Sequence, residues 1–287
     1  MRGIIKRVAG GIFHVINREQ QWIVHSPGKI KMSQKLLVGD KVEFSEEQGN
    51  FIIDRVFARK NEFYRPKAAN VDIVIIVASM VEPQFDSYLT DKLLIHASQA
   101  GSEPLLLLTK TDLDHEKAKT ITREYEFCGY KVFHTELGQN SYEEMTTLLQ
   151  DKIVLLTGNS GVGKSTFLNQ LASKEIQTTS AISQKLGRGR HTTRHGEIFY
   201  IHGFYLIDTP GFSSFEVKDL NEGEHLGDFF PEFHSFARSC KFNTCMHDQE
   251  PECGIKKAVA EGNILASRYA SYKALLKEIK RKEEERW

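Results

Sequence analysis

The 287-residue sequence predicts an α/β protein in three parts: a small N-terminal β-barrel, a central doubly wound, mainly parallel sheet, and a mainly helical, cysteine-rich C-terminal domain. Three observations predict this organisation. Short alternating strands fill most of residues 1–57, buried apolar strands then alternate with helical segments, and three cysteines cluster with a histidine near the end. The predicted domains are 1–68, 69–216 and 217–287.

Charge is distributed unevenly along the chain. The whole sequence is neutral, with 38 basic and 38 acidic residues, but residues 1–68 hold 13 Lys and Arg against 7 Asp and Glu. A basic module on a nearly neutral or acidic body indicates that the first part meets a polyanion, although ordinary surface lysine would give the same count.

No segment has the pattern of a targeting or membrane sequence. The start, MRGIIKRVAGG, lacks an uninterrupted apolar stretch, and no window approaches the roughly 18 apolar residues that a membrane helix needs. We therefore expect a cytoplasmic protein with no membrane partner.

Five β-like runs separated by turn residues predict the barrel. The runs are GIIKRVA, GIFHVIN, QWIVHSP, DKVEFSE and NFIIDRVF. Five strands with basic edges suit an OB-fold, whose face often binds RNA or DNA. Phe13, Trp22 and Phe44 are either stacking platforms for bases or, as we favour, barrel core. The polar, basic segment 58–67 is interpreted as a linker.

From residue 71, apolar runs alternate with helical patterns, which is typical of a parallel sheet that binds ligands at the carboxyl ends of its strands. The expected strands are 71–79, 104–110, 130–135, 152–158, 196–201 and 204–209, and the expected helices are 87–101, 113–128, 141–150 and 164–172. A last helix should run from about 263 to the end, with the charge run 277–286 as a solvated face.

A phosphate-binding loop follows the strand 152–158. GNSGVGKS, residues 158–165, matches G-x4-G-K-[ST] in the strand-to-helix setting that the motif requires. Its backbone amides can wrap phosphates at a helix N-terminus, Lys164 can reach the β- and γ-phosphates, and Ser165 can ligate Mg²⁺. The predicted loop residues are Gly158, Asn159, Ser160, Gly161, Val162, Gly163, Lys164, Ser165 and Thr166.

Two segments downstream carry the pattern of nucleotide switches. LIDTPG places Asp208 at the end of an apolar strand and Gly211 three residues later, the D-x-x-G arrangement of GTPases. Asp208 can hold the magnesium shell through water, and the Gly211 amide can sense the γ-phosphate. Between these motifs, GRGRHTTR (187–194) offers two threonines as Mg²⁺ and γ-phosphate ligands and predicts a first switch loop.

The motif TKTD, formed by Thr109, Lys110, Thr111 and Asp112, ends another apolar strand. The Asp112 carboxylate can accept from guanine N1–H and the exocyclic amine, which adenine does not offer, and the Lys110 stem can cover the ring. GTP is therefore the predicted nucleotide, and an ATP-dependent enzyme with an accidental TKTD is the alternative. The matching purine loop should follow the next strand, near residues 134–136.

Hydrolysis requires a group that orients the attacking water. Phe212 stands where Ras-like enzymes have a glutamine, and an apolar side chain cannot hold water by hydrogen bonding. Intrinsic turnover should be slow unless another group or a partner supplies the contact. His191, beside the switch threonines, is the internal candidate, and a solvent-facing histidine in a loop is the alternative.

Four metal-ligating residues lie close together near the C-terminus. Cys240, Cys245, His247 and Cys253 follow the pattern C-x4-C-x-H-x5-C. Three thiolates and one imidazole form a closed tetrahedral set for one structural Zn²⁺, with no open coordination position for catalysis.

The order of these motifs is unusual, because TKTD precedes the phosphate loop whereas most GTPases have the phosphate loop first. The chain closely resembles the RsgA (YjeQ/YloQ) family of circularly permuted GTPases. The resemblance lies in the order of its parts, which are a small barrel, TKTD, GNSGVGKS, RHTTR, DTPG and the cysteine-histidine cluster. The resemblance implies Mg²⁺ with GTP, Thr193 as the switch ligand and His191 as the catalytic histidine. It also implies that the barrel contacts ribosomal RNA. Thr109 departs from the more usual asparagine.

The resemblance implies a GTP hydrolase that binds the small ribosomal subunit and its rRNA, assists late maturation of the subunit and is stimulated by it. An RNA-binding scaffold that only senses GTP or GDP, with incidental hydrolysis, is the alternative. Because the sequence contains no extended apolar seam for a dimer, we expect a monomer.

Overall fold

The computed structural model describes residues 1–26, 35–64, 66–136, 142–175, 196–208 and 225–285. The chain divides into two compact units. The first comprises Met1–Val77, Ala100–Glu103 and Gly138–Ser214, and the second comprises Ala78–Gln99, Pro104–Leu137 and Phe215–Trp287. In the described part of the chain, no helix has the length and apolar character that a membrane span requires.

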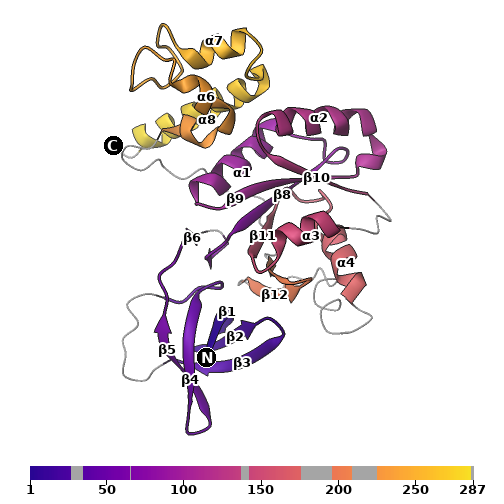
Figure 1. Ribbon diagram of the computed structural model, residues 1–287, viewed down its shortest axis with the longest axis vertical. Coiled ribbons are helices and arrows are strands. Elements are labelled where there is room, and N and C mark those ends of the chain that lie inside the picture. Colours follow the sequence, from indigo (N-terminus) through magenta and orange to yellow (C-terminus); the bar gives the residue numbers. More distant parts are fainter. Residues whose placement is uncertain (27–34, 65, 137–141, 176–195, 209–224, 286–287) are drawn as a thin grey trace. The chain divides into compact units, whose positions relative to one another are not determined.

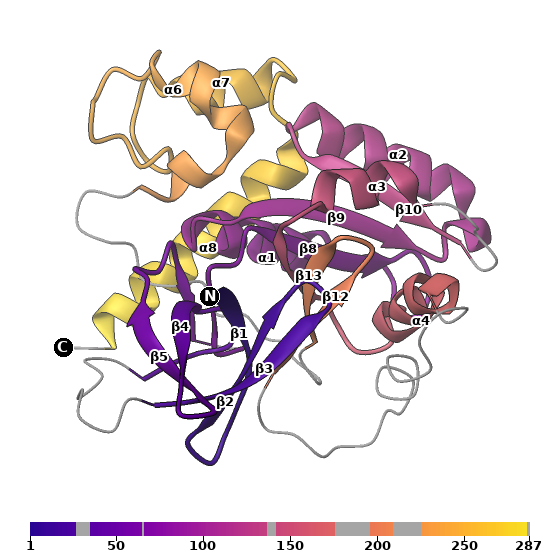
Figure 2. The same cartoon turned by 60° about the horizontal axis from the view of Figure 1, so that its bottom comes forward.

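The N-terminal strands close into a barrel, as the alternation predicts (Figures 1 and 2). The strands are β1 (Arg2–Ala9), β2 (Ile12–Asn17), β3 (Gln20–His25), β4 (Lys41–Glu47) and β5 (Asn50–Val56). Their order is β1-β2-β3-β5-β4, with β4 returning to β1 and with β3 and β5 parallel. This closed five-stranded arrangement is the OB-like barrel that we expected.

The barrel core contains the aromatic residues for which the sequence allowed two roles. Phe44 is fully buried and Phe13 is 8% exposed, so both belong to the core. Trp22 is half-buried, and its ring centroid lies 5.3 Å from that of Phe44. The core interpretation is confirmed for the two phenylalanines, and Trp22 lies at the edge of the same cluster.

The segment 58–67, interpreted from its composition as a linker, contains short paired structure. The short strands β6 (Glu62–Phe63) and β7 (Ala68–Ala69) pair across it. The Arg59 guanidinium donates to both carboxylate oxygens of the fully buried Asp40, at 2.7 and 2.8 Å. Burial of this bidentate ion pair fixes the segment against the barrel, an effect that composition alone does not reveal.

The central strands form a six-stranded sheet of order β10-β9-β8-β11-β13-β12. Its strands are β8 (Ile73–Ser79), β9 (Glu103–Thr109), β10 (Lys131–Thr135), β11 (Ile153–Thr157), β12 (Glu197–Ile201) and β13 (Phe204–Asp208). The pairs β9–β10, β8–β11 and β11–β13 are parallel, and β12 joins β13 antiparallel. Every residue of β8 and β11 is buried, as expected for strands covered on both faces.

The helices that alternate with these strands lie close to their predicted positions. They are α1 (Ser87–Gln99), α2 (His115–Phe127), α3 (Glu143–Leu149) and α4 (Lys164–Glu175). The α2 N-terminus is capped by Asp114, whose carboxylate accepts from the Lys117 amide at 3.1 Å. The predicted strand–helix alternation and mainly parallel sheet are confirmed.

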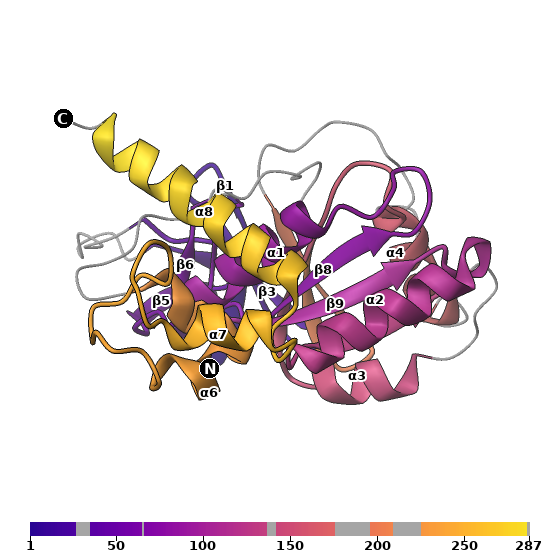
Figure 3. The ribbon, with the colours of Figure 1, turned by 90° about the horizontal axis from the view of Figure 1, so that it is seen from above.

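The C-terminal part is helical, as predicted. Its elements are the 3₁₀ turns η2 (Leu226–Phe229) and η3 (Pro231–Phe233) and the helices α6 (His234–Ala237), α7 (Gly254–Ala260) and α8 (Ala266–Glu284). Figure 3 shows α8 lying along α1. Within the charge run expected to be a solvated face, Glu278 accepts from Lys92 Nζ at 2.7 Å and Ile279 is buried, so one side of this run is packed.

A buried arginine joins the elements of the second unit. Arg268 on α8 is 2% exposed and ion-pairs with Asp91 of α1 and with Glu232 of η3, the latter at 2.7 Å from Nε. Its Nη2 donates to the Tyr130 hydroxyl at 3.1 Å, and its guanidinium lies 4.8 Å from the Phe230 ring centroid. One side chain therefore fixes α1, α8 and the chain around the C-terminal turns together.

Candidate nucleotide-binding and metal sites

The phosphate loop connects β11 to α4 and depends on glycine at its first position. Gly158 has φ +145°, and a Cβ built there would lie 2.2 Å from the Val77 backbone oxygen. Gly161 and Gly163 also have positive φ, at 79° and 95°. Val162 is buried and anchors the loop from inside. Only glycine permits this close, left-handed backbone path, which is the kind of path by which phosphate-binding loops turn their amides toward an anion.

Lys164 begins α4 with its side chain folded back over the loop. Its Nζ donates to the backbone oxygens of Gly158 at 2.6 Å and Asn159 at 2.5 Å. Burial lowers the pKa of Lys164. The ammonium is thus held within the predicted phosphate-binding loop, while Ser165 and Thr166 are exposed at the start of the helix.

The TKTD loop leaves β9 through a left-handed residue. Lys110 has φ 55° and ψ 35°, and its ammonium donates to the backbone oxygens of Val81, at 3.0 Å, and Glu82. Thr109 is buried, with its hydroxyl 3.4 Å from the Ala78 oxygen. Asp112 lies in the turn η1 (Thr111–Leu113) and is exposed, so its carboxylate is accessible to a base edge.

The sequence predicts a purine-binding loop near residues 134–136 but does not identify its contacts. The Thr111 hydroxyl donates to the Glu136 carboxylate at 3.0 Å, so TKTD and the end of β10 meet. His134 lies on the same strand, and burial lowers its pKa. Parallel pairing of β9 with β10 explains this contact, because it brings their carboxyl ends to one edge.

Several predicted site residues lie outside the described part of the chain. They are His191, Thr193, Gly211 and the residue at the water-orienting position, Phe212. Asp208 is the last residue of β13 and pairs in register with Glu197 of β12. The strand therefore ends where the D-x-x-G motif begins, as the sequence predicts.

The predicted metal ligands converge. Reactive atoms of Cys240, Cys245, His247 and Cys253 all lie within 4.8 Å of one another. His247 Nδ1 is 3.5 Å from the sulfurs of Cys240 and Cys253, and these two sulfurs are 3.9 Å apart. A tetrahedral ion with Zn–S of about 2.3 Å and Zn–N of about 2.0 Å separates its ligands by about 3.8 Å (S–S) and about 3.5 Å (S–N). Cys240, His247 and Cys253 lie at the separations of such a shell, and Cys245 lies within 4.8 Å of the other ligand atoms, so the four residues could hold a metal ion.

The surroundings of the cluster favour a bound cation. Burial raises the pKa of the Cys245 thiol, so a thiolate there requires positive charge nearby. Desolvation lowers the pKa of His247, which keeps the imidazole neutral and able to ligate. The Gly254 amide lies 3.3 Å from the Cys240 sulfur, and the Tyr269 hydroxyl donates to the His247 carbonyl at 2.8 Å. These two hydrogen bonds orient the ligands Cys240 and His247.

The fold and the motifs define a P-loop GTPase whose motifs occur in permuted order. Its mainly parallel sheet carries a phosphate loop, and two of its strands end at the TKTD and D-x-x-G motifs. The sequence model of the RsgA GTPase family matches residues 56–218. The chain belongs to this family and is a GTPase, a hydrolase acting on GTP.

Relatives that match over almost the whole chain carry the RsgA name. The small ribosomal subunit biogenesis GTPase RsgA of Shouchella clausii is 41% identical over 286 residues, covering 96% of this chain and 97% of the relative. The protein of the same name from Clostridium acetobutylicum is 38% identical over 275 residues, covering 95% of both. The similarity therefore extends over the barrel and the metal cluster as well as the GTPase motifs.

Two solved structures share the fold over almost the whole chain. The crystal structure of YloQ, described as a circularly permuted GTPase, has a TM-score of 0.82 at 31% identity and covers 98% of this chain and 95% of its own. YjeQ from Thermotoga maritima also has a TM-score of 0.82, at 33% identity, with 97% and 98% covered. The permuted order predicted from TKTD is thus also the order stated for YloQ.

Proposed function

We propose that this GTPase assists late maturation of the small ribosomal subunit, that its barrel contacts ribosomal RNA, and that subunit binding stimulates GTP hydrolysis. The proposal rests chiefly on one observation, full-length identity of about two residues in five to relatives named for small ribosomal subunit biogenesis. The surplus of basic residues in 1–68 supports RNA as the barrel's partner. Such a partner would place the protein in the cytoplasm, and the absence of an extended apolar seam from the sequence supports a monomer.

The proposed nucleotide is GTP, with the phosphates in the loop 158–166 and the base at TKTD. Lys164 and the loop amides stabilise negative charge that develops on the phosphates during in-line attack by water. Asp112 accepts hydrogen bonds from guanine, and the Lys110 stem covers the ring. Bound Mg²⁺ would supply further charge stabilisation and would be held by Ser165, Thr193 and, through water, Asp208.

His191 is the proposed group that orients the attacking water, because Phe212 cannot do so. The Gly211 amide is proposed to contact the γ-phosphate. These two segments, 187–195 and 211–217, would then change with nucleotide state and alter the fit of the flanking domains, 1–68 and 217–287, to RNA.

The metal at the cysteine-histidine cluster is proposed to be one structural Zn²⁺. Three thiolates and an imidazole fill a tetrahedral shell and leave no position for water or substrate. The ion's contribution would be stability of the surrounding helices rather than chemistry. Metal analysis of purified protein should give about one zinc per chain.

GTPase rates with added small subunits, large subunits and free ribosomal RNA test the proposal. We expect stimulation by small subunits alone, and loss of activity in Lys164→Ala because the phosphate charge is no longer neutralised. Lys174→Ala, outside the phosphate loop on the same helix, is the matched control. A normal basal rate without stimulation would favour the scaffold, in which hydrolysis is incidental.

Nucleotide choice is tested separately by competition of GTP and ATP for the site. Asp112→Asn should remove the preference for guanine, because an amide cannot accept from both guanine donors in the same way. Glu116→Gln alters an exposed carboxylate of α2 nearby and should leave the preference intact. Equal competition by ATP in the wild type would identify an ATP-dependent enzyme instead.

A further inference from the structure

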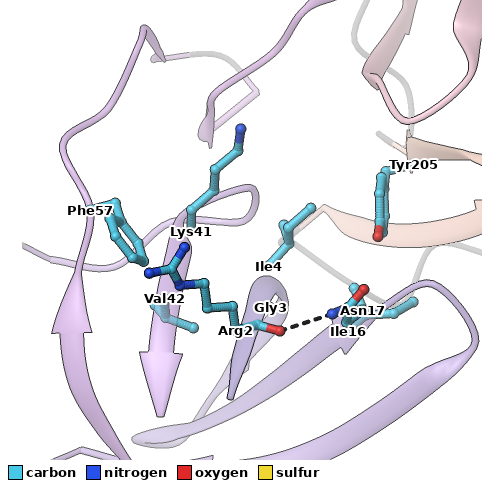
Figure 4. Close-up of a pocket in the computed structure, with 9 residues that line it drawn as sticks. All are labelled: Arg2, Gly3, Ile4, Ile16, Asn17, Lys41, Val42, Phe57 and Tyr205. Carbon is cyan, nitrogen blue, oxygen red and sulfur yellow. Dashed lines mark hydrogen bonds between the residues drawn. The ribbon is translucent and has the colours of Figure 1, made fainter.

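A pocket of about 410 Å³ lies beside strands β1 and β4 of the barrel (Figure 4). Its lining includes Ile16, Val42 and Tyr205, whose side chains are buried. These three side chains belong to the packing around the pocket and offer no surface to a ligand. The Asp112 carboxylate of the TKTD turn, by contrast, is exposed, so its orientation depends on the contacts that hold the turn.

One carboxylate holds the TKTD turn from the neighbouring strand. Glu136 directly follows β10, which pairs in parallel with β9, the strand that leads into the turn. Glu136 Oε1 accepts a hydrogen bond from the Thr111 hydroxyl at 3.0 Å and lies 4.0 Å from His115 Nδ1. Thr111 directly precedes Asp112, and His115 follows it by three residues. One oxygen therefore contacts the chain on both sides of the residue proposed to read guanine.

The hydrogen bond to Thr111 is the stronger of these two contacts. Thr111 is 2% exposed, and a hydroxyl that donates to an ionised carboxylate forms a stronger hydrogen bond than a neutral pair does. The His115 and Glu136 side chains are 63% and 44% exposed, and an exposed pair at 4.0 Å contributes little. The Thr111 hydroxyl is thus the group through which Glu136 can fix the turn.

Other contacts fix the entry of the turn. Lys110 has a left-handed backbone conformation, and its ammonium donates to the backbone oxygens of residues 81–82. The Thr109 hydroxyl lies 3.4 Å from a backbone oxygen of β8, near the limit of a hydrogen bond. Threonine also has fewer hydrogen-bonding groups than the asparagine that is more usual at this position in the family. The contact with Glu136 acts further along the turn, next to Asp112 itself.

We propose that Glu136 is a positioning residue for guanine selection. By holding the Thr111 hydroxyl, it keeps the Asp112 carboxylate in the orientation that accepts from both guanine N1–H and the exocyclic amine. A turn that is ordered before the nucleotide arrives loses less conformational freedom on binding, which raises the affinity. Glu136 acts through Thr111 and does not need to touch the base. The inference rests on the proposed function, because it assumes that TKTD binds guanine.

Binding of three nucleotides to the full-length chain tests the inference. The probes are GTP, inosine triphosphate, whose base lacks the exocyclic amine, and ATP, whose base does not offer the pair of donors that Asp112 accepts. In Glu136→Ala we expect GTP affinity to fall about tenfold and inosine triphosphate affinity about threefold, because two hydrogen bonds are weakened in the first case and one in the second. ATP affinity should stay unchanged. KM for GTP should rise while kcat stays within about twofold, since only uniform binding is lost.

Two further variants test the hydrogen bond itself. Glu136→Gln keeps an oxygen that accepts from Thr111, so GTP affinity should fall by less than about threefold. Thr111→Val removes the donor, keeps the shape of the side chain and should reproduce the losses of Glu136→Ala, including the case in which that variant fails to fold. The double variant should be no weaker than either single variant, because both remove one hydrogen bond. Glu116→Ala removes an 86% exposed carboxylate from α2 and is the matched control, with no change expected.

The outcomes separate this inference from the proposed function. An unchanged ratio of GTP to inosine triphosphate affinity in Glu136→Ala, when the wild type prefers GTP over ATP, would refute the inference and leave the proposed nucleotide site standing. Equal losses for all three nucleotides, a loss in Glu136→Gln as large as in Glu136→Ala, or additive losses in the double variant would also refute it. Equal binding of GTP and ATP by the wild type would instead refute guanine recognition at TKTD, whatever the variants show.

Discussion

The strongest stability prediction concerns Arg268, the buried arginine of α8. Arg268→Met keeps a long side chain against the Phe230 ring but removes the guanidinium that pairs with Asp91 and Glu232. Both carboxylates are almost fully enclosed, with side-chain exposures of 1% and 3%. The variant therefore leaves two buried acidic groups without their cation.

Removing one member of a buried ion pair costs about 3–5 kcal/mol, because the remaining charge is desolvated and unpaired. Here two carboxylates lose the same partner, so we expect the upper part of that range. Local opening of α8 should become easier by the same amount, which makes amide exchange in Ala266–Glu284 more than about a hundredfold faster. Exchange in the barrel strands, which belong to the other unit, should not change.

The loss of stability in Arg268→Met should depend on pH, and the direction of the dependence follows from the pKa of Asp91. Burial raises the pKa of Asp91, and the Arg268 charge acts against that rise. Without Arg268 the folded-state pKa lies further above the unfolded value, so lowering the pH protonates the folded form first and stabilises it. The difference in the free energy of unfolding from wild type should therefore shrink as the pH falls through the raised folded-state pKa of Asp91.

Hydrogen exchange followed by mass spectrometry resolves α8 from the barrel in the full-length chain. Lys92→Met is the matched control, because it removes one cation from the same α1–α8 contact where Lys92 and Glu278 are partly exposed, at 16% and 19%. We expect it to cost roughly 1 kcal/mol. Similar exchange in the two variants, or acceleration spread over the barrel, would refute the reasoning.

Three further predictions follow from close contacts. Gly158→Ala should weaken GTP binding at least about tenfold in calorimetry, because its Cβ would meet a backbone oxygen of β8 at 2.2 Å, whereas Gly262→Ala has open space and should not. Cys240→Ser should lower both the metal content and the melting temperature of the helices around the cluster, and added chelator should reproduce the loss of stability in the wild type. Asp40→Ala should destabilise the barrel by about 3 kcal/mol in denaturant unfolding, because Arg59 loses its buried partner and keeps only the exposed Glu62 carboxylate, and an unchanged midpoint would contradict this.

Local patterns predicted most of the fold because each element carries its own signal. The all-buried strands β8 and β11 appear as unbroken apolar runs, and the barrel strands alternate as a half-buried sheet should. The metal ligands could be predicted because all four lie close together in the sequence, between residues 240 and 253.

What local patterns did not predict are contacts between residues far apart in the chain. Arg59 looked like part of a basic linker and Arg268 like an ordinary helix residue, yet both are paired with buried carboxylates. Glu278 belonged to a run expected to face solvent, but Lys92 meets it from α1. In each case the residue that forms the ion pair lies far away in the sequence, so the pair exists only in the folded chain.

The permuted order is compatible with the sheet, because a sheet requires only that its strands have the right neighbours. Strand β8 pairs with β11 in parallel although a helix, two strands and two further helices lie between them in sequence. The chain ends are therefore free to lie elsewhere, and here the chain continues past Asp208, the last residue of β13, into the part that contains the metal ligands and α8. The permutation thus changes the order in which the motifs follow one another without changing which strands pair.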